Sequence, residues 1–131
     1  MIGLDTNILL RFYLKDDPVQ SPKAHHVVNS LSPGKQGWVS LATILELIWV
    51  VRKKKQAGRD QIADLLESLL TQDVLVLEQS EVVAMAIQRF RTTKADFADC
   101  LMAESARAAG CSKTLTFDQI AARDLGMELI A

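Results

Sequence analysis

Cysteine, long apolar runs and an excess of charge of either sign are what this sequence most clearly lacks. Its only cysteines are Cys100 and Cys111, which fit no metal-binding spacing and suit a reducing cytoplasm. No apolar stretch approaches the roughly 20 residues that a membrane-spanning helix needs, so we expect no membrane partner. No basic segment followed by an apolar signal region opens the chain, which favours a cytoplasmic rather than a secreted protein.

Charge and composition favour an ordered domain and leave its partner open. Lysine and arginine total 15 against 16 aspartates and glutamates, a formal net charge of −1. This balance neither supports nor excludes a nucleic-acid partner, because a basic patch can lie on a nearly neutral protein. Hydrophobic residues make up 49% and charged residues 24% of the chain, as in ordinary globular proteins. We therefore predict a single domain that spans residues 1–131.

Strand-like segments alternate with helical segments along the whole chain. The predicted strands lie at about residues 1–5, 37–39, 74–77, 114–116 and 127–130. The predicted helices lie at about 7–15 and 21–31 and around 62–69, and three more begin after the caps Ser40, Ser80 and Asp96. A last short helix follows the fourth strand and runs through about residue 124. This alternation predicts an α/β fold with a central parallel sheet of about four to five strands and helices on both faces.

Four acidic residues stand in segments that otherwise resemble protein interior. Asp5 closes the first predicted strand, Asp118 follows the fourth, and Asp99 begins the helix that leads into that fourth strand. Parallel strands end on the same edge of a sheet, so we expect these carboxylates to converge, together with Glu46 if its helix packs beside them. Clustered carboxylates repel one another unless a hard cation such as Mg²⁺ or Mn²⁺ binds their oxygens. The pattern predicts a metal site that activates water against a phosphodiester.

Each of these carboxylates also has a purely structural alternative. Asp96 and Asp99 form a D-x-x-D pattern that is typical of a capping box at a helix start. Asp5 and Asp118 each precede a predicted helix and can cap it, although Thr6 or Asn7 is better placed than Asp5 to cap the first helix. Glu46 borders an apolar helix stripe, and its own place in the helix favours a solvated position at the margin of that stripe. The predicted members of that stripe are Leu41, Ile44, Leu45 and Ile48.

Four short sequence blocks carry the acidic residues, and together they are spread along nearly the whole chain. They are IGLDTN at 2–7, Glu46 after SLAT at 40–43, DFADCLMA at 96–103 and LTFD at 115–118. In this order and spacing, the chain resembles the PIN-domain ribonucleases, and within them the toxins of VapBC-type toxin–antitoxin pairs. The resemblance implies a PIN-like fold and Mg²⁺-dependent endonucleolytic cleavage of RNA, with Mn²⁺ as an alternative metal.

The resemblance also implies roles for individual residues and partners. The acidic positions of the family correspond to Asp5, Glu46, Asp99 and Asp118, each implied as a catalytic and metal-binding residue. The implied supporting residues are Thr6, Asn7 and Asp96. The family forms homodimers and is covered by an antitoxin peptide. This agrees with the apolar runs at 8–10, 12–13 and 48–51, which carry more apolar surface than one helix face needs and so indicate a protein–protein interface.

Two positions depart from the family pattern. Cys100 stands where many members have alanine, and Phe117 stands before Asp118 where many have arginine or asparagine. Neither departure removes a carboxylate. The second bears on contacts with the substrate, so the sequence predicts the chemistry but no RNA sequence preference.

Basic residues near the acidic blocks are candidates for phosphate contacts with RNA. These candidates are Arg11, Arg89, Arg91 and Lys94. A dense basic run at 52–55, together with Arg59, is a weaker candidate of the same kind. The alternative for all of them is a solvated helix end, where cations are common.

Two other functions are compatible with parts of the pattern. A PIN-like fold can serve as a non-catalytic interaction or dimerisation module, although intact carboxylates argue against this. A phosphohydrolase of the haloacid dehalogenase type also places an aspartate after its first strand. That chemistry needs a second aspartate two residues later, where this chain has Asn7.

Overall fold

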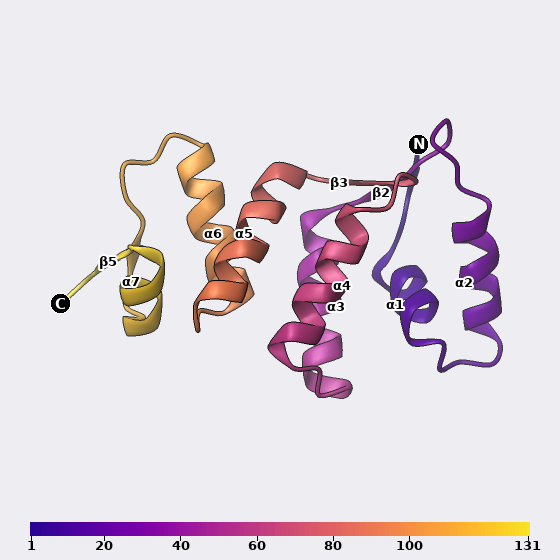
Figure 1. The fold of residues 1–131 in the computed structure, drawn as a ribbon, viewed down its shortest axis with the longest axis horizontal. Helices are drawn as coiled ribbons and strands as arrows, with labels where there is room; N and C mark the ends of the chain where they lie inside the picture. Colours follow the sequence, from indigo (N-terminus) through magenta and orange to yellow (C-terminus); the bar gives the residue numbers. More distant parts are fainter. The chain divides into compact units, whose positions relative to one another are not determined.

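The computed structural model describes residues 1–131 and shows strands alternating with helices along the chain (Figure 1). The chain groups into two compact units. Unit 1 comprises Met1–Gly58 and Ser68–Glu78, and unit 2 comprises Arg59–Glu67 and Gln79–Ala131. That the whole chain folds as one domain stays a prediction. None of the helices combines the length and the apolarity that a bilayer crossing requires.

Unit 1 contains a three-stranded parallel sheet in the order β1-β2-β3. Its elements are β1 (Ile2–Gly3), α1 (Thr6–Leu14), α2 (Gln20–Asn29), β2 (Gly37–Val39), α3 (Leu41–Lys54) and β3 (Leu75–Leu77). In the register, Gly37 of β2 pairs with Ile2 on one side and with Leu75 on the other. Helix α1 packs against α2 and α3, and Figure 1 shows α1 and α2 side by side.

The buried face of α3 differs in part from the predicted stripe. The helix begins after Ser40, whose side chain accepts a hydrogen bond from the Thr43 N–H as expected for a cap. The buried residues of the helix are Ile44, Leu47, Ile48 and Val51. The prediction that Leu45 is buried is wrong, because 37% of this residue is exposed. Apolar residues occupy two overlapping stripes of the same spacing here, so periodicity alone cannot choose between them.

Unit 2 contains the remaining elements and a two-stranded parallel sheet of β4 and β5. Its elements are α4 (Arg59–Leu70, through Glu67), α5 (Ser80–Thr92), α6 (Phe97–Ala108), β4 (Leu115–Thr116), α7 (Gln119–Leu125) and β5 (Glu128–Leu129). Helix α5 packs against α6, and α7 contacts α6, β4 and β5. The α/β class with five parallel strands is confirmed, but the strands pair as three plus two rather than as one continuous sheet.

The start of α5 differs from the prediction by one residue. The N-cap is Gln79, in the left-handed region with φ 49°, and Ser80 is already helical, so the predicted cap at Ser80 is wrong. Glu78 still belongs to the strand pairing, because its backbone N–H donates to the carbonyl of Val39 at 2.9 Å. The turn into the helix therefore falls on Gln79, and Ser80 is the first helical residue. The Glu78 carboxylate accepts from the Leu41 N–H at 2.9 Å and so helps to cap α3.

Gly37 is a position where the fold of unit 1 leaves no room for a side chain. A Cβ atom there would lie 2.7 Å from Cδ1 of Leu4 and 3.1 Å from Cδ1 of Leu31. We expect Gly37→Ala to lower the free energy of unfolding by about 1–3 kcal/mol, because an overpacked core must shift side chains. Urea denaturation measures this. Gly34→Ala is the control, since a Cβ there meets only ordinary contacts; equal stability of the two variants would contradict the expected clash.

Candidate active site

The predicted acidic residues divide between the two units. Asp5 and Glu46 belong to unit 1, whereas Asp96, Asp99 and Asp118 belong to unit 2. The structure contains no group of three or more His, Cys, Asp or Glu side chains arranged as metal ligands. It does show what each carboxylate does within its own unit, and this distinguishes several of the structural alternatives.

Asp5 is placed by the end of β1 and the start of α1. The Leu4 N–H donates to the carbonyl of Trp38 at 2.9 Å, which carries the sheet pairing up to the residue before Asp5. Asp5 takes the N-cap position of α1 with extended backbone (φ −78°, ψ 158°), yet its side chain makes no capping hydrogen bond. The capping alternative is therefore wrong for this carboxylate. It is exposed and remains available to a ligand.

Glu46 lies on the exposed side of α3. Its neighbour Leu45 is partly exposed, whereas Leu47, on its other side, is fully buried. The glutamate itself is exposed. Both alternatives, metal ligand and solvated surface residue, are compatible with this place. Its role as a ligand stays a prediction.

Three carboxylates of unit 2 interact electrostatically around the start of α6. Burial raises the pKa of Asp99 above its usual value, and the negative charges of Asp96 and Asp118 raise it further. Asp96 is the N-cap of α6 and Asp99 its third helical residue, as the capping-box alternative predicted, but the Asp96 side chain does not make the hydrogen bond of a capping box. Within this unit, Asp99 is a half-buried carboxylate beside two like charges.

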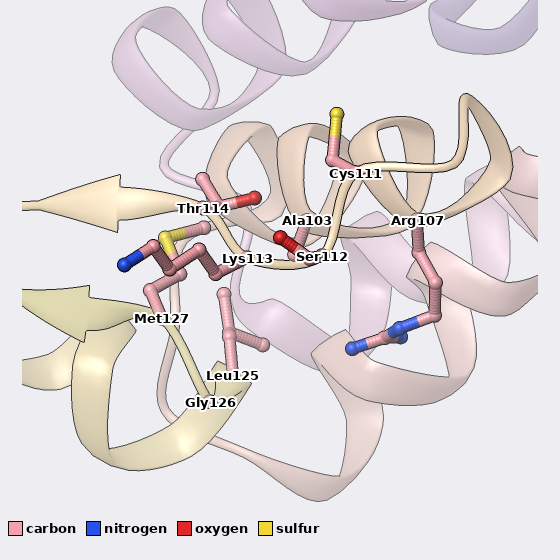
Figure 2. Close-up of a pocket in the computed structure, with 9 residues that line it drawn as sticks. All are labelled: Ala103, Arg107, Cys111, Ser112, Lys113, Thr114, Leu125, Gly126 and Met127. Carbon is pink, nitrogen blue, oxygen red and sulfur yellow. The ribbon is translucent and has the colours of Figure 1, made fainter.

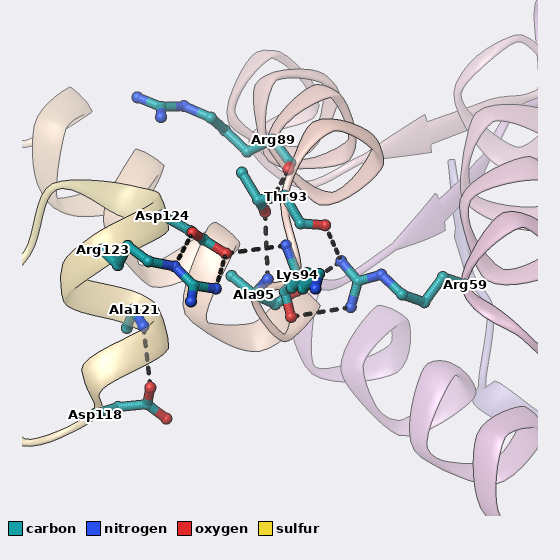
Figure 3. Close-up of polar contacts among 9 residues, drawn as sticks. All are labelled: Arg59, Arg89, Thr93, Lys94, Ala95, Asp118, Ala121, Arg123 and Asp124. Carbon is teal, nitrogen blue, oxygen red and sulfur yellow. Dashed lines mark hydrogen bonds and ion pairs between the residues drawn. The ribbon is translucent and has the colours of Figure 1, made fainter.

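Asp118 does cap a helix, as its alternative predicted. One carboxylate oxygen, Oδ1, accepts from the Ala121 N–H at 3.0 Å at the start of α7 (Figure 3). The Asp118 N–H donates to Oγ1 of Thr116 at 2.9 Å. This capping role fixes the side chain next to the end of β4. It does not exclude metal binding, because a carboxylate has a second oxygen.

The chemistry of this donor set fits a hard divalent cation. Every candidate ligand is a carboxylate, and oxygen ligands are those that Mg²⁺ and Mn²⁺ prefer. A partly buried carboxylate beside two others is electrostatically unfavourable without a cation. Thr6, which follows Asp5 in the sequence, is buried with 5% of its surface exposed, whereas Asn7 is exposed. The supporting roles of Thr6 and Asn7 stay predictions.

Most of the predicted RNA-contact residues are held by partners within the protein. Arg11 lies 3.1 Å from Asp16 and donates to Gln20 at 2.9 Å. Arg89 Nε lies 3.2 Å from the carboxylate of Glu104. Arg91 is ion-paired as well, 2.7 Å from Asp64 and 3.1 Å from Glu67. The fourth candidate, Lys94, is exposed. Ion pairs fix and partly neutralise a side chain, so the three arginines are less free to bind phosphate than an unpaired cation would be. Contact of any of the four residues with RNA stays a prediction.

Sequence reasoning missed Glu104, the one buried acidic residue. It is 3% exposed and accepts from Nη1 of Arg107 at 2.8 Å in addition to its pair with Arg89. A buried carboxylate is tolerated when cations pair with it in this way. The sequence carries a weak signal, because Glu104 stands between Ala103 and Ser105 within the apolar face of α6.

A small pocket of about 70 Å³ lies in unit 2 (Figure 2). It is lined by Ala103, Arg107, Cys111, Ser112, Lys113, Thr114, Leu125, Gly126 and Met127. Its two cations are already paired, Arg107 with Glu104 at 2.8 Å and Lys113 with Glu128 at 3.1 Å. No candidate metal ligand is among the lining residues, so the pocket is separate from the candidate site.

Comparison with known proteins agrees with the resemblance seen in the sequence. The PIN domain family matches residues 2–124 of this chain. A VapC ribonuclease of Aquifex aeolicus (strain VF5) is 22% identical over 114 residues, which cover 87% of this chain and 84% of that protein. At this identity the relationship to that ribonuclease is distant. Because the family match spans nearly the whole sequence, the protein belongs to the PIN-domain family.

Proposed function

We propose that the protein is a Mg²⁺-dependent endoribonuclease and the toxin of a type II toxin–antitoxin pair. The observation that carries the proposal is the carboxylate of Asp99, half-buried beside Asp96 and Asp118 with a raised pKa. A carboxylate in this setting is a candidate for function, because its ionised form needs a cation nearby. The exposed, uncapped carboxylate of Asp5 adds a second candidate ligand. Family membership supports the nuclease class.

In this proposal, the metal ligands are Asp5, Glu46, Asp99 and Asp118. Bound Mg²⁺ or Mn²⁺ supplies Lewis-acid activation of water and neutralises charge at the phosphate. The protein orients its donors: α7 holds Asp118 through the Ala121 N–H, and α6 presents Asp99 in its first turn. Water rather than the 2′-hydroxyl is the nucleophile, so the products carry a 5′-phosphate.

The proposed partners are RNA, a cognate antitoxin protein and a second copy of the chain. The distant relationship to a VapC ribonuclease supports the first two. The candidates for phosphate contact are Arg11, Arg89, Arg91 and Lys94. An exposed apolar residue such as Trp49, 52% of which is accessible, is typical of interface residues and supports a dimer.

The metal requirement gives the most direct test. We expect the purified protein to cleave single-stranded RNA with Mg²⁺ or Mn²⁺ and to lose this cleavage when a chelator is added, because the ligands are all carboxylates. Gel analysis of a labelled RNA measures cleavage. Ligation of an adaptor to the products, with and without phosphatase, detects the 5′-phosphate.

A variant purified in the same way controls for contaminating nuclease. Asp5→Asn keeps the size and the exposed position of the side chain but removes its charge, so it should be inactive in the same preparation. Cleavage that survives the chelator, or that persists equally in Asp5→Asn, would contradict the proposal. RNA binding without cleavage in Mg²⁺ would favour the non-catalytic interaction module instead.

A further inference from the structure

The guanidinium of Arg59 donates hydrogen bonds to several backbone carbonyl groups at and just after the end of α5. Its Nη2 atom donates to the carbonyl oxygens of Phe90 and Ala95, each at 2.8 Å, and lies 3.1 Å from that of Thr93. Its Nη1 atom lies 3.4 Å from the carbonyl oxygen of Lys94. Figure 3 shows the side chain extending from the start of α4 to the loop formed by residues 93–95. One cation therefore satisfies carbonyl groups that the end of a helix leaves unpaired.

The same guanidinium is tied to the start of α6 through two aromatic rings. The Arg59 Cζ atom lies 3.9 Å from the centre of the Phe90 ring. Phe90 in turn meets Phe97 edge to face, with ring centres 5.7 Å apart. Phe97 is the first residue of α6 and is 1% exposed. A shift of Arg59 would therefore be felt at the first turn of α6, where Asp99 lies.

A second anchor holds the loop at residues 93–95 from the side of α7. The Lys94 N–H donates to Oδ2 of Asp124 at 3.0 Å, and Arg123 holds that carboxylate at 2.8 Å (Figure 3). The hydroxyl of Thr93 donates to the carbonyl of Arg89 at 2.7 Å and accepts from the Ala95 N–H at 3.3 Å. The N–H and carbonyl groups of residues 94 and 95 are thus all engaged, which leaves this short loop little freedom.

This loop leads directly to the acidic residues. Asp96 follows Ala95 and is the N-cap residue of α6. Arg59 and Asp124 hold the backbone of residues 94 and 95, directly before this start of the helix. We propose that Arg59 is a positioning residue of the metal site: it holds the loop that leads into α6, so that the carboxylate of Asp99 is presented to a divalent cation with Asp96 beside it. This role rests on the proposed function.

Charge and position make opposite predictions for Arg59, which allows a sharp test. If Arg59 acted only through its charge, its removal would tighten cation binding, because a positive charge opposes a second one. If it positions the loop, its removal should weaken binding. Loss of a group that orients metal ligands typically lowers metal affinity about 10- to 100-fold, and we expect Arg59→Gln to fall in this range for Mn²⁺.

Arg59→Lys gives a second way to separate the effect of the positive charge from the effect of positioning the loop. Lysine keeps the charge but has a single nitrogen, which cannot span the carbonyl groups that the guanidinium fork reaches. We therefore expect Arg59→Lys to weaken Mn²⁺ binding as well. Arg107→Gln is the matched control, because it removes one arginine of the same unit that reaches no part of the loop; Glu104 keeps its pair with Arg89. This control should bind Mn²⁺ as the wild type does.

The experiment is a Mn²⁺ titration of the full-length proteins, followed by the electron paramagnetic resonance signal of free Mn²⁺ at a temperature well below each melting transition. Hydrogen exchange of the metal-free proteins gives a second readout: the amides of residues 94–99 should exchange faster in Arg59→Gln than in Arg107→Gln. Should Arg59→Gln fail to fold, Arg59→Lys carries both measurements.

The outcomes distinguish this role from the proposed function. Wild-type protein that binds no Mn²⁺ would overturn the metal site itself. Wild-type protein that binds Mn²⁺, with unchanged or tighter binding by Arg59→Gln, would overturn only the positioning role. Wild-type affinity in Arg59→Lys would do the same, because it would show that the guanidinium and its hydrogen bonds to several carbonyl groups are not needed for binding. Weaker binding by both variants, with an unaffected control, supports the role.

Discussion

Asp99→Asn is expected to abolish RNA cleavage and at the same time to raise the melting temperature of the metal-free protein. The loss of activity should exceed the about 10- to 100-fold effect typical of residues that only orient a ligand, because a direct ligand is removed. The gain in stability follows from the raised pKa of Asp99, caused first by burial and then by Asp96 and Asp118. An amide removes a charge that this environment opposes.

The sign of this effect depends on pH. A carboxyl group whose pKa is raised by folding favours the folded state below its unfolded pKa, about 3.9 for aspartate. That contribution is lost as the pH rises through the raised pKa of the folded protein. The advantage of Asp99→Asn over the wild type should therefore be absent below about pH 3.9 and fully developed above the raised pKa. Saturating Mg²⁺ should reduce it, because the cation stabilises only the wild-type carboxylate.

Thermal melts in chelator, taken across this pH range, measure the difference. Asp73→Asn is a suitable control, since Asp73 is an exposed residue of unit 1 outside the candidate site. A marked loss of stability in Asp99→Asn would contradict the expectation, and it would restore a structural role for the residue at the start of α6. Retained cleavage would remove Asp99 from the site.

The order and type of the elements could be predicted because they depend on local signals. Apolar segments bounded by turn residues gave all five strands, and the cap at Ser40 is where its side chain predicted it. The misplaced cap at Ser80 shows the limit of such signals. There, Glu78 continues the pairing of β3 and Gln79 makes the turn, so contacts to β2 rather than local preference set the helix start.

The acidic residues could be named from the sequence, but their capping roles could not. Three of them precede helices, and the sequence gives each the same capping alternative. Only the structure shows that Asp118 caps its helix, whereas Asp5 and Asp96 do not. All three have extended backbone at the N-cap, so the backbone alone does not distinguish them.

The network around Arg59 could not be predicted at all, because its partners are backbone carbonyls. Every residue has a carbonyl, so nothing in the identity of Thr93, Lys94 or Ala95 marks them as acceptors for a distant guanidinium. The sequence showed Arg59 only as part of a basic run beside Gly58. Its function in the fold emerges when α4 brings it to the end of α5.

Expression of the protein alone is expected to arrest bacterial growth, and Glu46→Gln is expected to relieve that arrest. Glu46 is the candidate ligand with the weakest independent support, because its exposed position on α3 suits a solvated residue equally well. If it binds the metal, the neutral amide is a poorer ligand, and activity should fall by orders of magnitude. If it faces solvent, the substitution should have almost no effect, as surface changes typically alter stability by less than about 0.5 kcal/mol.

Growth after induction, compared at matched protein levels, separates these alternatives. Glu81→Gln is the matched control, because Glu81 is an exposed glutamate in the first turn of α5 and is no part of the candidate site. It should arrest growth as the wild type does. A gel-filtration comparison should show Glu46→Gln in the same oligomeric state as the wild type, since the substitution keeps the shape of the side chain. Full toxicity of Glu46→Gln would exclude the residue from the metal site and leave the three aspartates, Asp5, Asp99 and Asp118, as its ligands.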